Sequence, residues 1–168
     1  SPAQTQRITH LLSRKPESPT GAAFSVVSTG QANGEYVFEV FVQNVPELRT
    51  YQVKLEVSGG TAGSLTMTDV RIDESRQDYV FKGNEAVKAA DHGGSRLGGT
   101  LFDGTVAVAA PKYVGTWRYR PSSDAAGTFK INVVSGAESF IANLQNQNLP
   151  VSAVGATVQI GGKSRLSD

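Results

Sequence analysis

The sequence predicts an all-β domain built as a sandwich or barrel, and two observations support this prediction. Residues 36–43 and 50–57 each gather large apolar side chains on one face with a period of two, as a half-buried strand does. The composition agrees, because the 168 residues include 18 glycines and 7 prolines, which is typical of a turn-rich β protein. A chain of this length can form one domain with a full core.

The two alternating segments also predict which side chains face the core. The apolar faces consist of Tyr36, Phe38, Val40 and Val42 in the first segment and of Tyr51, Val53, Leu55 and Val57 in the second. The opposite face of the second segment carries Thr50, Gln52 and Lys54, which are expected to meet water or a partner. Val45 and Pro46 are expected to form the turn between the strands, because proline has no N–H to give to a sheet.

The remaining elements follow in order along the chain. Further strands are expected at residues 23–28, 64–72, 79–81, 97–102, 105–109, 115–120, 127–133 and 151–160. Residues 73–96 are mostly polar, so we expect long loops there around the short strand at 79–81. A weak helical pattern leaves open one short helical turn near residues 137–147, before Pro150. We expect residues 1–20 to be a flexible linker or arm, residues 21–162 the domain, and residues 163–168 a tail.

Several classes of function are disfavoured by what the sequence lacks. The absence of cysteine excludes disulfides, thiolate metal sites and a cysteine nucleophile. The only histidines are His10 and His92, and no serine lies in a nucleophile elbow, so an enzyme is not expected. A net charge of +1 gives no basic field for nucleic acid, and no apolar run is long enough for membrane insertion.

A weak calcium site is one alternative that the sequence leaves open. Acidic side chains cluster at Asp69, Asp73, Glu74 and Asp78, and calcium prefers carboxylate ligands. Arg71 and Arg76 are interleaved with them, and the spacing matches no metal loop. A charge-balanced surface is therefore the favoured interpretation, and no metal-binding residue is assigned.

Sugar binding is a second alternative, carried by Trp117 and Tyr119 on the strand expected at 115–120. Flat rings exposed on a sheet can stack against a sugar. Two large rings on one face of an alternating strand are more often part of a core. We therefore predict that both rings are buried.

Three segments, in order, resemble cohesin domains of bacterial extracellular assemblies. They are residues 35–57 with the turn Asn44-Val45-Pro46, the segment Leu101-Phe102-Asp103-Gly104, and residues 128–161 with the closing VGATVQIG strand. The resemblance implies a jelly-roll β-sandwich of about nine strands. This chain departs from the family pattern in the long polar segment 73–96.

The resemblance implies a noncatalytic module that docks a calcium-loaded dockerin on another protein through one sheet face. The calcium would lie on the partner, and no cofactor is expected on this chain. Carried over by position, the partner-binding residues are Thr50, Gln52 and Lys54 on the third strand, Tyr79 on the fifth, Leu101 and Asp103 on the sixth, Lys130 and Asn132 on the eighth, and Glu138 and Ser139 in the following loop. Leu101 is expected to be the exposed apolar centre of this face.

Two other functions remain as alternatives to docking. The first is a carbohydrate-binding module on a similar sandwich, with a polysaccharide as its partner. The second is a structural domain of an extracellular surface protein, which would bind neither a dockerin nor a polysaccharide. All three readings imply an extracellular or cell-surface location within a larger secreted protein.

Overall fold

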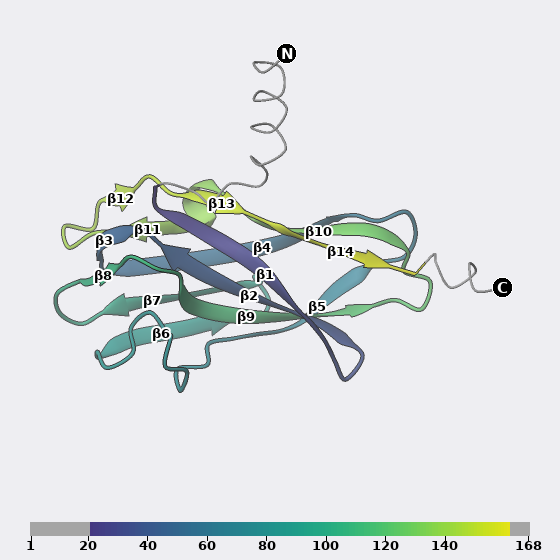
Figure 1. Cartoon of the computed structure of the whole chain (residues 1–168), viewed down its shortest axis with the longest axis horizontal. Helices are drawn as coiled ribbons and strands as arrows, with labels where there is room; N and C mark the ends of the chain where they lie inside the picture. The colour runs from purple at the N-terminus through teal and green to yellow at the C-terminus, as the bar shows by residue number, and fades with distance from the viewer. Residues whose placement is uncertain (1–20, 162–168) are drawn as a thin grey trace, which may run out of the picture.

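The computed structural model describes residues 21–161, which form an all-β sandwich (Figure 1). The strands are β1 (Ala23–Ala32), β2 (Glu35–Gln43), β3 (Val45–Leu48), β4 (Thr50–Gly59), β5 (Leu65–Arg71), β6 (Ala86–Asp91), β7 (Arg96–Leu101), β8 (Val106–Val108), β9 (Lys112–Pro121), β10 (Gly127–Val133), β11 (Phe140–Ala142), β12 (Asn148–Leu149), β13 (Ser152–Val154) and β14 (Ala156–Ile160). One 3₁₀ turn, η1 (Gly136–Glu138), precedes β11. The predicted fold class is confirmed. The expected linker and tail lie outside the described residues.

Two sheets form the layers of the sandwich. The first has the strand order β13-β1-β2-β9-β5, and the second has the order β12-β11-β4-β10-β14. The β6–β7 hairpin joins the second sheet, because β7 pairs with β4 along the edge opposite β10 and β11. The short strands β3 and β8 pair with each other.

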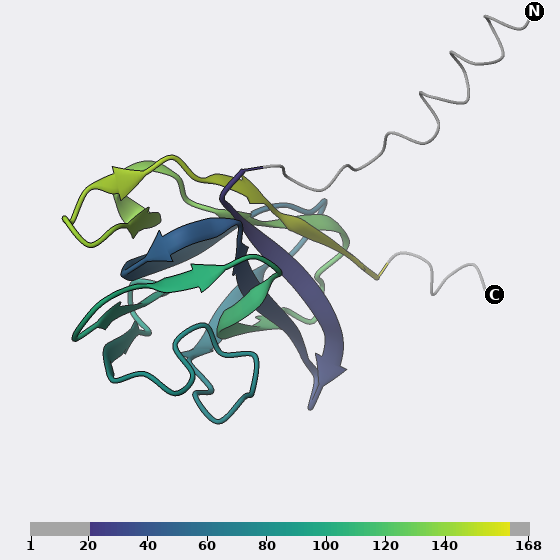
Figure 2. The same ribbon diagram turned by 60° about the vertical axis from the view of Figure 1, so that its left-hand side comes forward.

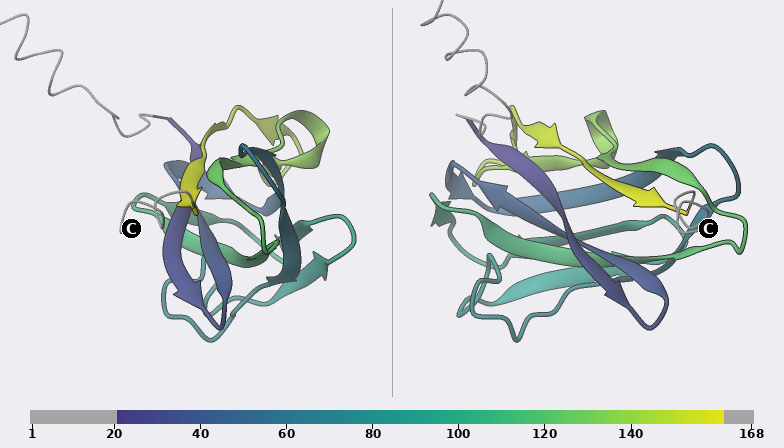
Figure 3. Two further views of the ribbon diagram at one scale, coloured as in Figure 1. Left: turned by 90° about the vertical axis from the view of Figure 1, so that its right-hand side faces the viewer. Right: turned by 45° about the vertical axis from the view of Figure 1, so that its right-hand side comes forward.

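The end of the chain closes one side of the sandwich. β13 pairs in parallel with β1 of the first sheet, whereas β14 pairs with β10 of the second. Figure 2 shows this segment in yellow, passing from one sheet to the other. Figure 3 shows the yellow segment on the side of the domain opposite the β6–β7 hairpin. Because β6 pairs only with β7 among the described strands, its other edge is free.

The core lies between the sheets and is rich in aromatic rings. Phe38 of β2 and Tyr119 of β9 meet edge to face, with ring centroids 5.7 Å apart. Both alternating segments turn the predicted apolar faces inward, which confirms the phase assigned to them. Trp117 is fully buried, and its Nε1–H donates to the carbonyl of Ser95 at 3.1 Å. Trp117 and Tyr119 are therefore core residues, as predicted, and offer no ring for sugar stacking.

We expect the fluorescence of Trp117 to report this burial, because it is the only tryptophan of the chain. The emission of the native domain should be blue-shifted, and acrylamide should quench it weakly. Unfolding in guanidinium chloride should shift the emission to the red and expose the ring to the quencher. Strong quenching of the native domain would contradict the burial of Trp117.

One local prediction was wrong, and one that the sequence left open is decided. Residues 45–48 form β3 instead of a turn, and Pro46 is tolerated because this two-stranded pair is irregular between Val45 and Leu48. The short helical turn left open near residues 137–147 is present as η1, and the chain then extends as β11, whose Ile141 is buried in the core.

The segment 73–96 is more ordered than its composition indicates. Residues 79–81 contribute only an isolated bridge between Tyr79 and Tyr113, so the expected strand there is wrong. The strand lies further on, as β6, which pairs with β7 over its whole length. Sequence alone missed β6 because Ala, Lys and Asp favour strands weakly.

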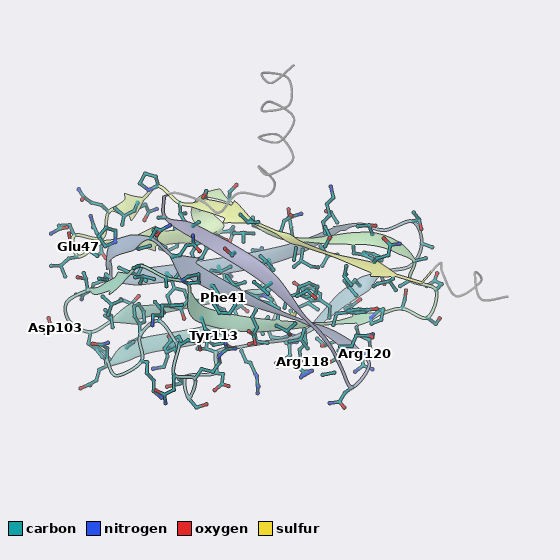
Figure 4. The ribbon with its side chains drawn as sticks, viewed as in Figure 1. Phe41, Glu47, Asp103, Tyr113, Arg118 and Arg120 are labelled. Carbon is teal, nitrogen blue, oxygen red and sulfur yellow. The ribbon has the colours of Figure 1, made fainter. Side chains whose placement is uncertain are left out.

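Arg76 fixes the connection that leads from β5 to β6. Its guanidinium binds Asp78 through two hydrogen bonds of 2.9 Å and Glu39 of β2 at 2.7 Å. It also lies 3.9 Å from the ring centroid of Tyr113. Figure 4 shows Phe41 and Tyr113 close together on the first sheet, with ring centroids 6.2 Å apart. The connection is thus held on the outer face of that sheet.

The acidic cluster is engaged by neighbouring groups. Asp73 accepts hydrogen bonds from Ser75, Glu74 pairs with Lys88 at 3.3 Å, and Asp78 pairs with Arg76. Arg76 also lowers the pKa of Asp78. Within residues 21–161 no group of three or more His, Asp or Glu side chains could hold a metal ion.

Candidate functional site

The outer face of the sheet formed by β6, β7, β4, β10 and β11 is the candidate site, and we call it the front face. Strand register arranges its side chains in rows that cross the strands. The rows are Asp91, Arg96 and Lys54, then Ala89, Gly98, Gln52 and Phe140, then Val87, Thr100, Thr50 and Ala142. On the other half of the face, Asn132 lies opposite Glu56 and Lys130 opposite Ser58.

Most of the predicted partner-binding residues lie where the sequence placed them. Thr50, Gln52 and Lys54 point outward from β4, and Lys130 and Asn132 belong to the same face on β10. Glu138 ends η1 beside this face. Asp103 is exposed in the turn after β7, at one end of the domain (Figure 4). Partner contact by these residues stays a prediction.

Leu101 does not lie on the front face. Leu97, Gly99 and Leu101 are the inward residues of β7, and Leu101 is only 2% exposed. The outward residues of β7 are Arg96, Gly98 and Thr100, so the expected alternation is shifted by one residue. The prediction that Leu101 is an exposed apolar centre is therefore wrong.

Tyr79 is also a core residue, only 4% exposed, and the strand that borders β7 on this face is β6. Its hydroxyl lies 3.1 Å from that of Tyr51, which in turn donates to the carbonyl of Val114 at 3.2 Å. Burial raises the pKa of Tyr79 to about 12, so the hydroxyl stays protonated as a donor. The prediction of an exposed Tyr79 is wrong.

Ser139 is buried as well and serves to attach β11 to β4. Its Oγ accepts a hydrogen bond of 2.9 Å from the backbone N–H of Lys54. A side chain buried in this way is not presented to a partner, so the expectation of an exposed Ser139 is corrected.

A network of hydrogen bonds and ion pairs crosses the front face from η1 to β6. The Arg96 guanidinium binds Asp91 of β6 and Glu138 of η1, each at 2.8 Å. Gln52 donates from Nε2 to the carbonyl of Glu138 at 2.9 Å. The side-chain hydrogen bond from Arg96 is the main cause of the lowered pKa of Asp91. The network fixes η1 against the sheet.

A groove of about 380 Å³ crosses the front face above Gly98. Its lining includes Val87, Ala89, Thr100, Gln52 and Phe140. Val87 is 56% exposed, and Phe102, just after β7, is 62% exposed, which makes this end of the face apolar. Sequence reasoning missed Val87, Ala89, Arg96 and Thr100, although Val87 and Ala89 alternate with Lys88 and Ala90 as strand residues do.

The described part of the chain contains a single histidine, His92. Its Nε2 lies 2.8 Å from the carbonyl oxygen of Thr68 and so ties the β6–β7 turn to β5. Within residues 21–161 no helix is long and apolar enough to cross a membrane.

Comparison with known proteins identifies the fold. No family model matches the sequence, and no curated protein matches it. Among solved structures, the sixth cohesin of Acetivibrio cellulolyticus scaffoldin B, in complex with a Cel5 dockerin mutant, matches with a TM-score of 0.57 and 11% identity, over 84% of this chain and 100% of that chain. A chain of the CaDoc0917–CaCohA2 complex matches with a TM-score of 0.56 and 13% identity, over 83% and 99%.

A third match is the type III cohesin module of the Ruminococcus flavefaciens cell-surface anchoring scaffoldin ScaE. Its TM-score is 0.52 at 10% identity, over 86% of this chain and 90% of that chain. The identities are low, so the likeness concerns the fold. The resemblance to cohesin modules read from the sequence is confirmed at that level.

Proposed function

We propose that this domain is a noncatalytic docking module that binds a calcium-loaded dockerin-type module of another protein through the front face. The single observation that carries the proposal is the cohesin-like fold, since one of the similar cohesins is in complex with a dockerin. The calcium would belong to the partner. The domain would act outside the cell, as part of a larger secreted or surface protein.

The physical character of the front face supports docking. Its side chains stand on paired strands, and its η1 side is fixed by Arg96 and Gln52, so binding would order few groups. The exposed apolar residues Val87 and Phe102 lie near the groove, whereas Lys130 lies toward the far end. An exposed apolar patch beside polar and charged side chains is consistent with a protein interface.

The test is capture from an array of purified dockerin modules, with calcium and with EDTA. We expect at least one module to bind the wild-type domain, and only when calcium is present. Thr100→Arg should weaken binding by about thirtyfold or more, because it places a long charged side chain on the front face, in the lining of its groove. Val27→Arg is the matched control, because Val27 is exposed on the outer face of the other sheet.

The proposal fails if the wild-type domain captures no dockerin, or if capture is equal with calcium and with EDTA. It also fails if both arginine variants bind as the wild type does. Binding of the domain to a glycan array, with no dockerin captured, would favour the carbohydrate-binding alternative.

A further inference from the structure

The groove on the front face is a gap in the middle row of side chains. Ala89 and Gly98 leave this row nearly empty on β6 and β7, while Val87 and Thr100 stand in the row on one side. Arg96 stands in the row on the other side. The groove therefore runs across the strands and opens at β6, the free edge of the sheet.

The groove is built into the backbone. A Cβ at Gly98 would lie 2.7 Å from the carbonyl oxygen of Tyr51, so the close approach of β7 to β4 requires glycine there. The next residue, Gly99, packs below against the rings of Tyr51 and Phe81. These close approaches define the floor of the groove, which is present in the unbound domain.

The ionic groups beside the groove are already paired with one another. Arg96 is already shared between Asp91 and Glu138, and the Nε2 of Gln52 is bound to the carbonyl of Glu138. The hydroxyls of Thr50 and Thr100 bind each other at 3.2 Å. A charged side chain entering the groove would lose water and would have to compete with these existing pairs, which is costly.

From this geometry we propose that the groove receives one large apolar side chain, aliphatic or aromatic, from the surface of the docked partner, and that this contact selects the partner. The inference rests on the proposed docking function. The apolar surface of Val87, Ala89 and Phe140 would cover the side chain. A volume of about 380 Å³ is large enough to admit any one apolar side chain.

The test fills the groove without touching its floor. Ala89→Trp places a ring in the groove from an exposed position of the edge strand, and Ala89→Ser leaves the groove open. Val27→Trp adds the same ring to the opposite face. The probe is the calcium-loaded dockerin that binds the wild-type domain most tightly on the array, with each large apolar surface residue replaced in turn by alanine.

Replacing one apolar dockerin residue with alanine should weaken binding of the dockerin to the wild-type domain by about thirtyfold. This is the effect expected for burying one large apolar side chain. The same substitution should have almost no further effect against Ala89→Trp, whereas Ala89→Ser and Val27→Trp should preserve the full loss. Thermal melting should show all three variants folded.

The inference is overturned if Ala89→Trp binds the dockerin as tightly as the wild type does. It is also overturned if no apolar residue of the dockerin is coupled to Ala89, or if a simple sugar displaces the dockerin from the wild type but not from Ala89→Trp. Absence of any dockerin that binds the wild type would instead refute the docking function itself, before any variant is measured.

Discussion

Replacing Leu101 with arginine should unfold the domain. Leu101 is 2% exposed, and its backbone N–H donates to the carbonyl of Arg49 at 3.0 Å, so its backbone is fixed in the sheet and its side chain lies in the core. Removing a buried leucine side chain costs about 2–5 kcal/mol, and an unpaired buried charge costs several kcal/mol more. Together these losses are comparable to the whole free energy of unfolding of an ordinary domain, about 5–15 kcal/mol. Circular dichroism and thermal melting would measure the loss.

The matched control is Thr100→Arg, one position earlier on the same strand. Thr100 points outward, so the new side chain can reach water, and the loss should be about 1 kcal/mol or less, mainly from the hydrogen bond to Thr50. The assignment of faces on β7 would be wrong if the Leu101 variant melted like the wild type while the Thr100 variant unfolded. Wild-type melting of both variants would mean that Leu101 is not in the core.

The phase of a strand can be read from the sequence only where side chains mark both faces. In β2, and in β4 as far as Val57, the inward positions carry large apolar residues, so the alternation assigned those faces correctly. In β7 the sequence RLGGTL has glycines at 98 and 99, one outward and one inward, and neither marks its face. Leu101 is buried and its neighbour Phe102 is exposed, although both are large and apolar, so residue type does not distinguish the two faces at this end of β7 either.

Tertiary contacts explain why the sequence does not reveal β6 and why it suggests a strand at Tyr79. The aromatic residues of the segment 73–96 are Tyr79 and Phe81, which made 79–81 the best strand candidate. Their rings instead pack beneath β4, where the Phe81 centroid is 5.5 Å from that of Tyr51. β6 is poor in strand-forming residues and exists because β7 offers it a partner edge.

The ionic network of the front face could not be predicted from the sequence. Arg96, Asp91 and Glu138 come together only when the β6–β7 hairpin and η1 flank the same strand, at separations of 5 and 42 residues. The outward residues of β4 could be predicted, because they depend on the alternation of one strand alone.

Arg76→Met should destabilise the domain by about 2–3 kcal/mol at neutral pH, since hydrogen bonds to charged groups contribute about 1.5–3 kcal/mol and a cation over a ring about 0.5–2. The variant loses the bonds to Asp78 and Glu39 and the contact with Tyr113. Denaturant unfolding of both proteins would measure the difference. Arg71→Met, a change at an exposed arginine of β5, should have a far smaller effect.

The pH dependence of this difference separates the ion pair from the ring contact. Arg76 lowers the pKa of Asp78 in the folded domain, so the pair stabilises the fold above the unfolded pKa of an aspartate, about 3.9, and loses that contribution as the pH falls through the folded value. The gap between the wild type and Arg76→Met should therefore shrink below about pH 4 without closing, because the guanidinium keeps its contact with Tyr113. A gap that is constant from neutral pH down to this range would assign the stabilisation to the ring contact alone. A gap that widens in acid would contradict the ion pair.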